Sequence, residues 1–274
     1  MDTTELTKDT TLCISLAARP SSIGTRFHNH LYGQLGLNFV YKAFTTTDLP
    51  AAIGGIRALG IRGAGVSMPF KSEVIALVDS MDDSALAIAS VNTIVNTDGH
   101  LRAYNTDYLA VAALLRERQV PTDAPFVVVG SGGMARAVVA ALRDCGFTDG
   151  VVVARNETAG RGLAQEYGFG WQPEVGDHRP ALVVNATPIG MTGGPEADDL
   201  PVPAEVVDAA ATVFEVVAVP EATPLVARAR ASGAAVITGT EVMALQAVEQ
   251  FVLYTGIRPT SEQFAAATAF SRAE

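Results

Sequence analysis

Cysteine is scarce in this sequence of 274 residues, and histidine is almost as rare. The two cysteines, Cys13 and Cys145, lie far apart and outside any CxxC or metal-binding spacing. We therefore expect free, mostly buried thiols in a reducing compartment. The histidines also lack a metal-ligand spacing, so no metal site is predicted. They are His28, His30, His100 and His178.

Long apolar runs and positive charge are also lacking. No apolar run reaches the roughly 18 residues that a membrane-spanning helix needs. The start of the chain, MDTTELTKDT, lacks the basic and apolar regions of a signal peptide. With 19 Lys and Arg against 29 Asp and Glu, the net charge of −10 argues against nucleic acid and anionic membranes as partners. We expect a cytoplasmic protein whose anionic ligands, if any, bind a few basic side chains or helix N-termini.

Strand-like and helix-like segments alternate from end to end, without an internal repeat. The length favours two domains, and the segment 121–125, with a proline at each end, reads as a linker or a tight turn. Strands are expected at 12–16, 39–44, 63–68, 92–96, 101–104, 126–129, 151–153, 181–184, 212–214 and 235–237. Helices are expected at 23–37, 48–59, 71–79, 107–118, 133–145, 241–254 and 261–270. The pattern predicts two α/β domains with mostly parallel sheets, the second of them doubly wound.

A glycine-rich turn follows the apolar strand 126–129 and precedes an Ala/Val-rich helix. This arrangement is typical of dinucleotide binding, in which a pyrophosphate lies against the free N–H groups of the helix start; the alternative is a plain glycine turn. The residues concerned are Gly130, Ser131, Gly132, Gly133, Met134 and Ala135. At the end of the next strand, Arg155 and Asn156 replace the acidic residue usual for NAD, which favours NADP. The alternative is that Arg155 is only a solvated surface charge.

Polar residues stand at the ends of the predicted strands in the first half of the chain. Lys71 follows Pro69-Phe70 and opens the expected helix 71–79, where its charge opposes the helix dipole. Asn92 opens the first strand of the predicted Asp98-Gly99 hairpin. The run Asn105-Thr106-Asp107 joins a strand to a helix, where simple capping is the alternative to a functional role.

These motifs, in their order along the chain, resemble those of shikimate dehydrogenases over nearly the whole length. The matching stretches are 69–71, 91–93, 105–107, the glycine turn, 185–191 and 246–251. The resemblance implies an N-terminal α/β substrate domain at 1–108, completed by the returning helices at 240–274, and a Rossmann-type NADP-binding domain at 109–239. It implies a monomer or homodimer in which NADP exchanges a hydride with shikimate or a related small, anionic cyclic polyol acid.

The resemblance also assigns roles to residues. Lys71 and Asp107 look like the family's catalytic pair, in which the Lys71 ammonium stabilises charge on a ring oxygen and moves its proton. The substrate-binding positions implied are Ser22, Ser67, Asn92, Asn105 and Gln246. Asn185, Thr187 and Gly239 look like positions on the cofactor side.

Two departures from the family pattern concern substrate recognition. Gly24 stands where the family has the second of two serines that hold the substrate carboxylate, and Ala218 replaces a substrate-contacting tyrosine. Ser21 or Thr25 can compensate, and Arg19 or Arg26 can add charge or simply be solvated. The departures indicate a divergent branch. They leave open quinate, an amino-substituted analogue or another ring acid as substrate, or a regulatory ligand-binding protein whose catalysis has lapsed.

Overall fold

The structure, a computed structural model, describes residues 6–272, which fall into two compact units. The first unit runs up to Thr106 and resumes at Gln246, and the second spans Asp107–Leu245. Residues 1–5, part of the polar N-terminal stretch considered above, and residues 273–274 lie outside the described range. Over the residues described, none of the helices combines the length and apolar character that crossing a bilayer demands.

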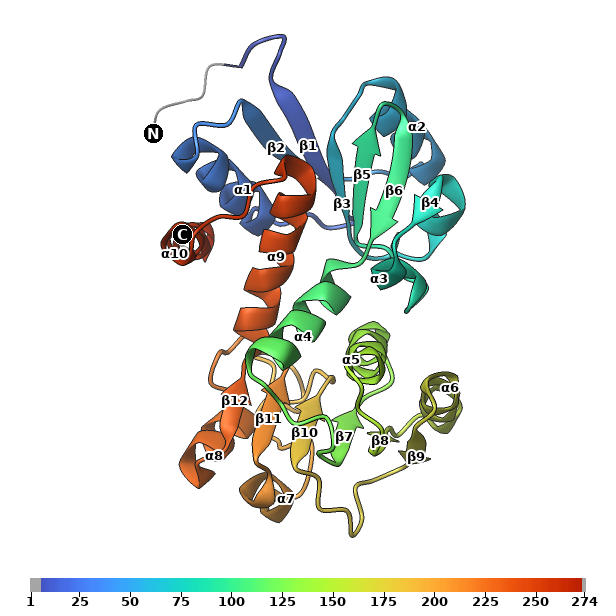
Figure 1. The fold of residues 1–274 in the computed structure, drawn as a ribbon, viewed down its shortest axis with the longest axis vertical. Coiled ribbons are helices and arrows are strands. Elements are labelled where there is room, and N and C mark those ends of the chain that lie inside the picture. Colours follow the sequence, from blue (N-terminus) through green and yellow to red (C-terminus); the bar gives the residue numbers. More distant parts are fainter. Residues whose placement is uncertain (1–5, 273–274) are drawn as a thin grey trace. The chain divides into compact units, whose positions relative to one another are not determined.

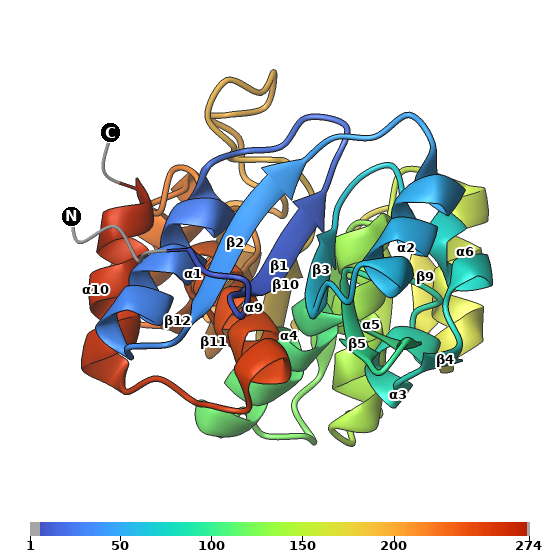
Figure 2. The same ribbon diagram turned by 90° about the horizontal axis from the view of Figure 1, so that it is seen from above.

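The first unit is built on a mixed six-stranded sheet in the order β2-β1-β3-β5-β6-β4. Its strands are β1 (Thr11–Leu16), β2 (Phe39–Phe44), β3 (Gly63–Val66), β4 (Ser80–Met81), β5 (Thr93–Thr97) and β6 (His100–Tyr104). The strands β2, β1 and β3 are parallel, whereas β5 runs antiparallel to both β3 and β6. The helical elements are α1 (Ile23–Gln34), α2 (Leu49–Ala58), the 3-10 helix η1 (Glu73–Leu77), α3 (Asp83–Leu86) and α10 (Ser261–Arg272). Helix α10 packs along α1, so the end of the chain completes the unit at its beginning (Figures 1 and 2).

The second unit holds a fully parallel six-stranded sheet in the order β12-β11-β10-β7-β8-β9. Its strands are β7 (Phe126–Val129), β8 (Gly150–Val153), β9 (Gly170–Gln172), β10 (Leu182–Asn185), β11 (Thr212–Glu215) and β12 (Ala235–Ile237). Its helices are α5 (Gly133–Asp144), α6 (Glu157–Tyr167), α7 (Ala204–Ala209) and α8 (Pro224–Ser232). Strand order reverses between β7 and β10, as in doubly wound dinucleotide-binding folds. The predicted α/β class with largely parallel sheets is therefore confirmed.

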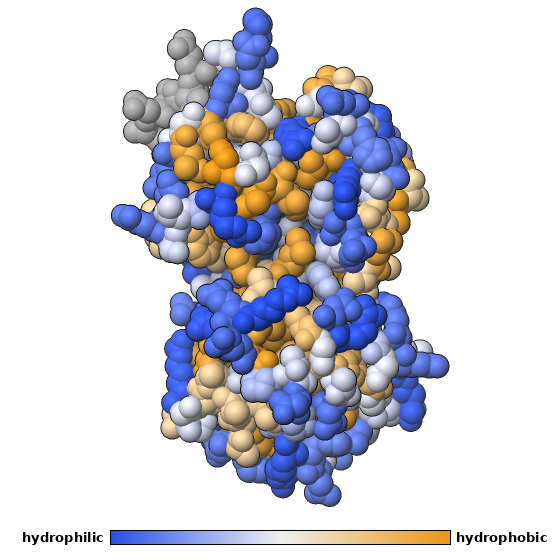
Figure 3. Space-filling view, in the orientation of Figure 1, coloured by the Kyte–Doolittle hydropathy of each residue, from blue (hydrophilic) through white to orange (hydrophobic). Residues whose placement is uncertain are grey.

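The boundary between the units falls within two helices, α4 (Thr106–Glu117) and α9 (Gly239–Thr255). Each unit has its own core. In the second unit all four residues of β7 are buried, and α5 buries an Ala/Val face that lets it pack closely on the sheet. Each fully buried Val or Leu contributes about 1.5–3 kcal/mol. On the face drawn in Figure 3, hydrophilic residues dominate the surface of this unit, as expected when its apolar strands are covered on both sides.

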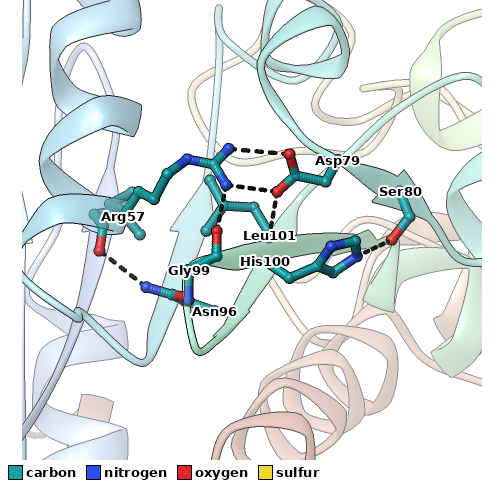
Figure 4. A network of polar contacts seen from close by, with 8 residues as sticks. Arg57, Asp79, Ser80, Asn96, Gly99, His100 and Leu101 are labelled. Atoms are coloured by element: carbon teal, nitrogen blue, oxygen red, sulfur yellow. Dashed lines mark hydrogen bonds and ion pairs between the residues drawn. The ribbon is translucent and has the colours of Figure 1, made fainter.

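The predicted Asp98-Gly99 hairpin is confirmed, and a polar network fixes it to the first unit. Asp98 and Gly99 have φ values of +51° and +87°, as the tight turn between β5 and β6 requires. Arg57 of α2 donates to the Gly99 carbonyl and to both carboxylate oxygens of Asp79 (Figure 4). Asp79 also accepts a 2.7 Å bond from the backbone of Leu101. The network ties α2, the hairpin and the segment before β4 together.

The prediction of an α-helix at 71–79 is wrong in both the type of helix and its length. Residues 69–72 form turns, and only Glu73–Leu77 is helical, as a 3-10 helix. The chain must be extended again at Ser80, because β4 pairs with β6 and Asp79 is held by the network above. Lys71 therefore does not lie at the start of an α-helix, and the expected conflict with a helix dipole does not arise.

Candidate functional site

The glycine turn after β7 has the two properties that a phosphate-binding turn requires. Gly130 has a φ of +122°, and a Cβ there would lie 2.8 Å from the carbonyl oxygen of Ala186, so glycine is needed. A Cβ on Gly132 or Gly133 would meet no heavy atom of the described residues within 4 Å. Gly132 is the N-cap of α5, whose first N–H groups lack partners inside the helix. Open space therefore lies over a helix start that can hold an anion.

A pocket of about 780 Å³ opens beside this turn, within the second unit. Its walls come from the turn, the end of β8 and the loops after β9 and β10. The volume is in the range of pockets that hold cofactors. The predicted cofactor positions that line it are Gly130, Ser131, Gly132, Arg155, Asn156 and Thr187. Those that do not line it are Gly133, Met134, Ala135, Asn185 and Gly239.

Two of the positions outside the pocket wall support the surrounding loops. Asn185, at the end of β10, is fully buried. Its Nδ2 donates to the Ile189 carbonyl at 3.0 Å and to Glu215 at 2.9 Å, and its Oδ1 accepts from the backbone and hydroxyl of Thr187. Gly239 opens α9 where a Cβ would lie 2.4 Å from the backbone of Val217. Both residues thus hold backbone in place rather than present polar atoms to the pocket.

Glu215, to which the sequence pattern assigns no role, is the charged partner of Asn185. It ends β11, has no exposed surface, and accepts hydrogen bonds from Asn185, the Val217 backbone and the Thr223 hydroxyl. Burial outweighs these donors and raises the pKa of the Glu215 carboxyl from 4.5 to about 7. Its signal in the sequence is a lone acidic residue that closes an apolar strand.

The polar residues beyond β8 face the same pocket. Asn156 is the N-cap of α6 and accepts a 3.0 Å hydrogen bond from the Ala159 backbone, which leaves its Nδ2 as a donor. Arg155 is exposed, and its guanidinium donates to both carboxylate oxygens of Glu196, at 3.0 and 3.3 Å. Glu196 comes from the loop after β10 and also lines the pocket. Nothing in the local sequence pattern indicated this pairing.

In the first unit, three of the five predicted substrate positions gather at one end of the sheet. Ser67 directly follows β3, Asn92 directly precedes β5, and Asn105 directly follows β6. Because β5 is antiparallel to both neighbours, with Thr93 opposite Gly65 and Tyr104, these three positions meet at the same sheet end. Ser67 is exposed, and Asn105 is buried with its Nδ2 donating to the Ser90 carbonyl at 3.0 Å.

Lys71 is joined to this sheet end through its backbone. The Lys71 carbonyl accepts a 2.9 Å hydrogen bond from the N–H of Val91, the residue before Asn92. The turn that carries Lys71 therefore lies beside the segment that carries Asn92. Asp107, the other half of the predicted pair, lies in the first turn of α4 and is the first residue of the second unit.

A buried chain of hydrogen bonds orients the Asn92 side chain. Gln250 of α9 donates through its Nε2 to the Thr93 hydroxyl at 2.8 Å, and Thr93 donates to Asn92 Oδ1 at 2.9 Å. The same Oδ1 accepts a 2.8 Å bond from the backbone of Thr106. The Thr106 hydroxyl is the third donor to this oxygen, at 3.2 Å. Asn92 Nδ2 is left as the donor that faces away from these partners.

His28 begins this chain of donors. Its Nε2 lies 3.2 Å from Gln250 Oε1, and its ring stacks on Tyr41. Burial lowers the pKa of His28 to about 3, so the ring is neutral at physiological pH. Because Gln250 Nε2 donates to Thr93, its Oε1 faces His28, and the His28 proton resides on Nε2. Along the chain from His28 to Asn92, each hydrogen bond therefore has its donor on the His28 side.

The loop after β1 carries the altered serine motif. Ser22 is the exposed N-cap residue of α1, and its side chain makes no capping hydrogen bond. A Cβ on Gly24 would lie 3.9 Å from the Tyr41 ring, so a serine would fit there. Arg26 donates to the Phe270 carbonyl and lies over the Phe270 ring. This arginine therefore anchors α10.

Gln246, the last of the predicted substrate positions, is a half-buried residue of α9. It is the residue at which the chain re-enters the first unit.

Over residues 6–272, His, Cys, Asp and Glu side chains form no group of three that could hold a metal ion. Cys13 and Cys145 are free thiols, the first buried and the second half-buried, as predicted.

Known proteins resemble this chain over nearly its whole length. The family model of the shikimate dehydrogenase substrate-binding domain matches residues 20–94. A shikimate dehydrogenase-like protein of Haemophilus influenzae is 51% identical, over 97% of this chain and 98% of the relative. The NADP(+) shikimate dehydrogenase of Moorella thermoacetica is 35% identical, over 91% of this chain and 90% of the relative.

Solved structures of known proteins also resemble this chain over nearly its whole length. The shikimate 5-dehydrogenase of Thermus thermophilus, in complex with NADP(H) and shikimate, has a TM-score of 0.83 at 28% identity, covering 95% of this chain and 99% of that one. The quinate dehydrogenase of Corynebacterium glutamicum, in complex with NAD, has a TM-score of 0.86 at 26% identity with the same coverage. The resemblance predicted from the motifs is confirmed: the chain belongs to the shikimate dehydrogenase family.

Proposed function

We propose that this chain is an NADP-dependent oxidoreductase that interconverts shikimate and 3-dehydroshikimate, or a close cyclic hydroxy acid. The observation that carries the proposal is the meeting of Ser67, Asn92 and Asn105 at one end of the first sheet, beside the turn of Lys71. The names of the relatives support the same activity. The proposed substrate domain is 1–108 with 240–274, and the proposed NADP domain is 109–239.

The pocket of the second unit fits a dinucleotide. The pyrophosphate would lie against the start of α5, over the open faces of Gly132 and Gly133. Arg155 would pair with the 2′-phosphate, and Asn156 Nδ2 would donate to it. Thr187 lines the pocket, while Asn185 and Gly239 hold the loops around it. When bound, NADP supplies or accepts the hydride.

The residues of this chain then move the proton and hold the ring. The Lys71 ammonium stabilises negative charge on the reacting oxygen and supplies its proton, and Asp107 holds the ammonium by its opposite charge. In the oxidative direction Lys71 accepts the hydroxyl proton. Asn92 Nδ2 donates to a ring oxygen. The other proposed contacts to the acid come from Ser22, Ser67, Asn105 and Gln246.

The test is turnover by the purified chain. Shikimate and quinate are each supplied with NADP+ and with NAD+, and appearance of the reduced cofactor is followed by absorbance. We expect the highest kcat/KM with NADP+ and one of the two ring acids. An absence of turnover with every combination, together with no binding of NADPH, would contradict the proposal.

A second candidate function, a binding protein with weakened catalysis, is favoured by Gly24 and Ala218. Each removes a side chain that the family pattern places on the substrate, and a lost neutral hydrogen bond is worth about 1 kcal/mol. Calorimetric binding of shikimate and NADPH without measurable turnover would select this candidate. Turnover would select the oxidoreductase.

Replacement of Thr93 by valine should weaken substrate binding without touching the substrate directly. The change removes one of the three donors from Asn92 Oδ1 and leaves Gln250 Nε2 unpaired, so the Asn92 carboxamide is held less firmly, by Thr106 alone. We expect the KM for the ring acid to rise about tenfold, which corresponds to about 1.4 kcal/mol, and the Kd for NADPH to stay unchanged. The matched control is Thr97→Val, at the exposed end of the same strand. Equal KM values for the two variants would show that the chain of donors does not orient Asn92.

A further inference from the structure

Arg155, the group proposed to bind the 2′-phosphate, already has an anionic partner in the pocket. Its two terminal nitrogens donate to the two carboxylate oxygens of Glu196, at 3.0 and 3.3 Å. This is the fork arrangement in which a guanidinium also binds a phosphate, through two parallel N–H groups. One fork face cannot hold a carboxylate and a phosphate at the same time.

Glu196 is held where it can make this contact. Its carbonyl accepts a 2.9 Å hydrogen bond from the Gly190 backbone, which closes the loop after β10 on itself. Its side chain is 31% exposed, whereas that of Arg155 is 77% exposed. The carboxylate is thus the more buried member of the pair, and the guanidinium is the more exposed one.

The pocket wall carries further negative charge. Glu174 and Asp177, in the loop after β9, line the same pocket as Arg155 and Glu196. Three carboxylates therefore accompany this single arginine in the wall. Their charges oppose an added phosphate dianion, and they do not oppose an uncharged ribose hydroxyl, which can donate to a carboxylate.

We propose that Glu196 is a cofactor-selecting residue: it occupies the Arg155 fork in place of the ribose 2′-phosphate and so lowers the preference for NADP over NAD. The inference rests on the proposed function, since it assumes that the pocket binds a nicotinamide dinucleotide. NADP binds after the Arg155–Glu196 pair opens, and NAD binds with the pair closed. Because exposed ion pairs are weak, the handicap is modest, about twofold to fivefold.

The experiment compares the dissociation constants of NADPH and NADH, measured by fluorescence titration. Glu196→Gln should tighten NADPH binding about twofold to fivefold, and NADH should bind unchanged or more weakly. The matched control is Asp198→Asn, which removes the same charge from an exposed position of the same loop outside the pocket wall. In the Arg155→Ala background, Glu196→Gln should give less tightening of NADPH, because the contested fork is absent.

Each result decides between the proposals. The selecting role of Glu196 is wrong if Glu196→Gln changes the dissociation constants of NADPH and NADH equally. It is also wrong if Glu196→Gln changes the dissociation constant of NADPH no more than Asp198→Asn does. In either case the proposed oxidoreductase stands. If the wild-type chain binds neither dinucleotide, the proposed function itself fails, and the role of Glu196 fails with it.

Discussion

Lys71→Met lowers kcat for the ring acid by about 10³-fold, within the range of about 10²–10⁴ that proton transfer by a positioned side chain contributes. Methionine has a similar length but neither charge nor proton, so the reacting oxygen loses both its electrostatic stabilisation and its proton source. Steady-state kinetics with the ring acid and NADP+ measure the loss.

The control for this result is Lys42→Met, which removes a lysine from the exposed face of β2 in the same unit. We expect its kcat to equal that of the wild type. NADPH binding should be unchanged in both variants, because the pocket of the second unit contains neither lysine. A Lys71→Met enzyme that turns over like the Lys42→Met enzyme would show that the proton comes from another group.

The parts of the fold that the sequence predicts well depend on local chemistry. The glycine turn and the Asp98-Gly99 hairpin each require particular residues at particular backbone angles, and each is found where predicted. The segment 71–79 is different, because its conformation is fixed by pairing of β4 with β6 and by the Arg57–Asp79 contact. Such contacts come from distant residues, and helical periodicity does not report them.

The same distinction holds for the candidate site. Asn92 and Ser67 could be named from short motifs, but the orientation of Asn92 depends on Gln250, which lies 157 positions after its partner Thr93. Asn185 was expected beside the cofactor, whereas its side chain bonds to Glu215, 30 positions later, and is fully buried. Glu196 meets Arg155 across 41 positions. In each case the sequence indicates the residue type that chemistry needs, and the fold decides which partner it meets.

Glu215 makes the protein less stable as the pH rises, and Glu215→Gln removes this effect. The pKa of the carboxyl is raised from 4.5 to about 7 in the folded state, because burial disfavours its charge. The folded state therefore holds this proton more tightly than the unfolded chain does. The free energy of unfolding falls as the pH rises from 4.5 to 7 and is level above that. At about 1.4 kcal/mol for each tenfold change in proton affinity, the total loss is about 3 kcal/mol.

Glutamine keeps an acceptor oxygen for Asn185 and the Val217 backbone, and its amide nitrogen takes the place of the protonated oxygen, toward which the Thr223 hydroxyl turns from donor to acceptor. We expect urea unfolding of Glu215→Gln and wild type to agree at pH 5 and to differ by about 2–3 kcal/mol in favour of the variant at pH 9.

His28, whose pKa is lowered to about 3, makes the protein more stable as the pH rises through the acid range. This effect is the same in both proteins and cancels in the comparison. Glu221→Gln, at an exposed position of the same unit, removes an equal charge without relieving burial and should follow the wild type. A Glu215→Gln protein that loses stability between pH 5 and pH 9 as steeply as Glu221→Gln would show that the three donors to Glu215, not burial, dominate its proton affinity.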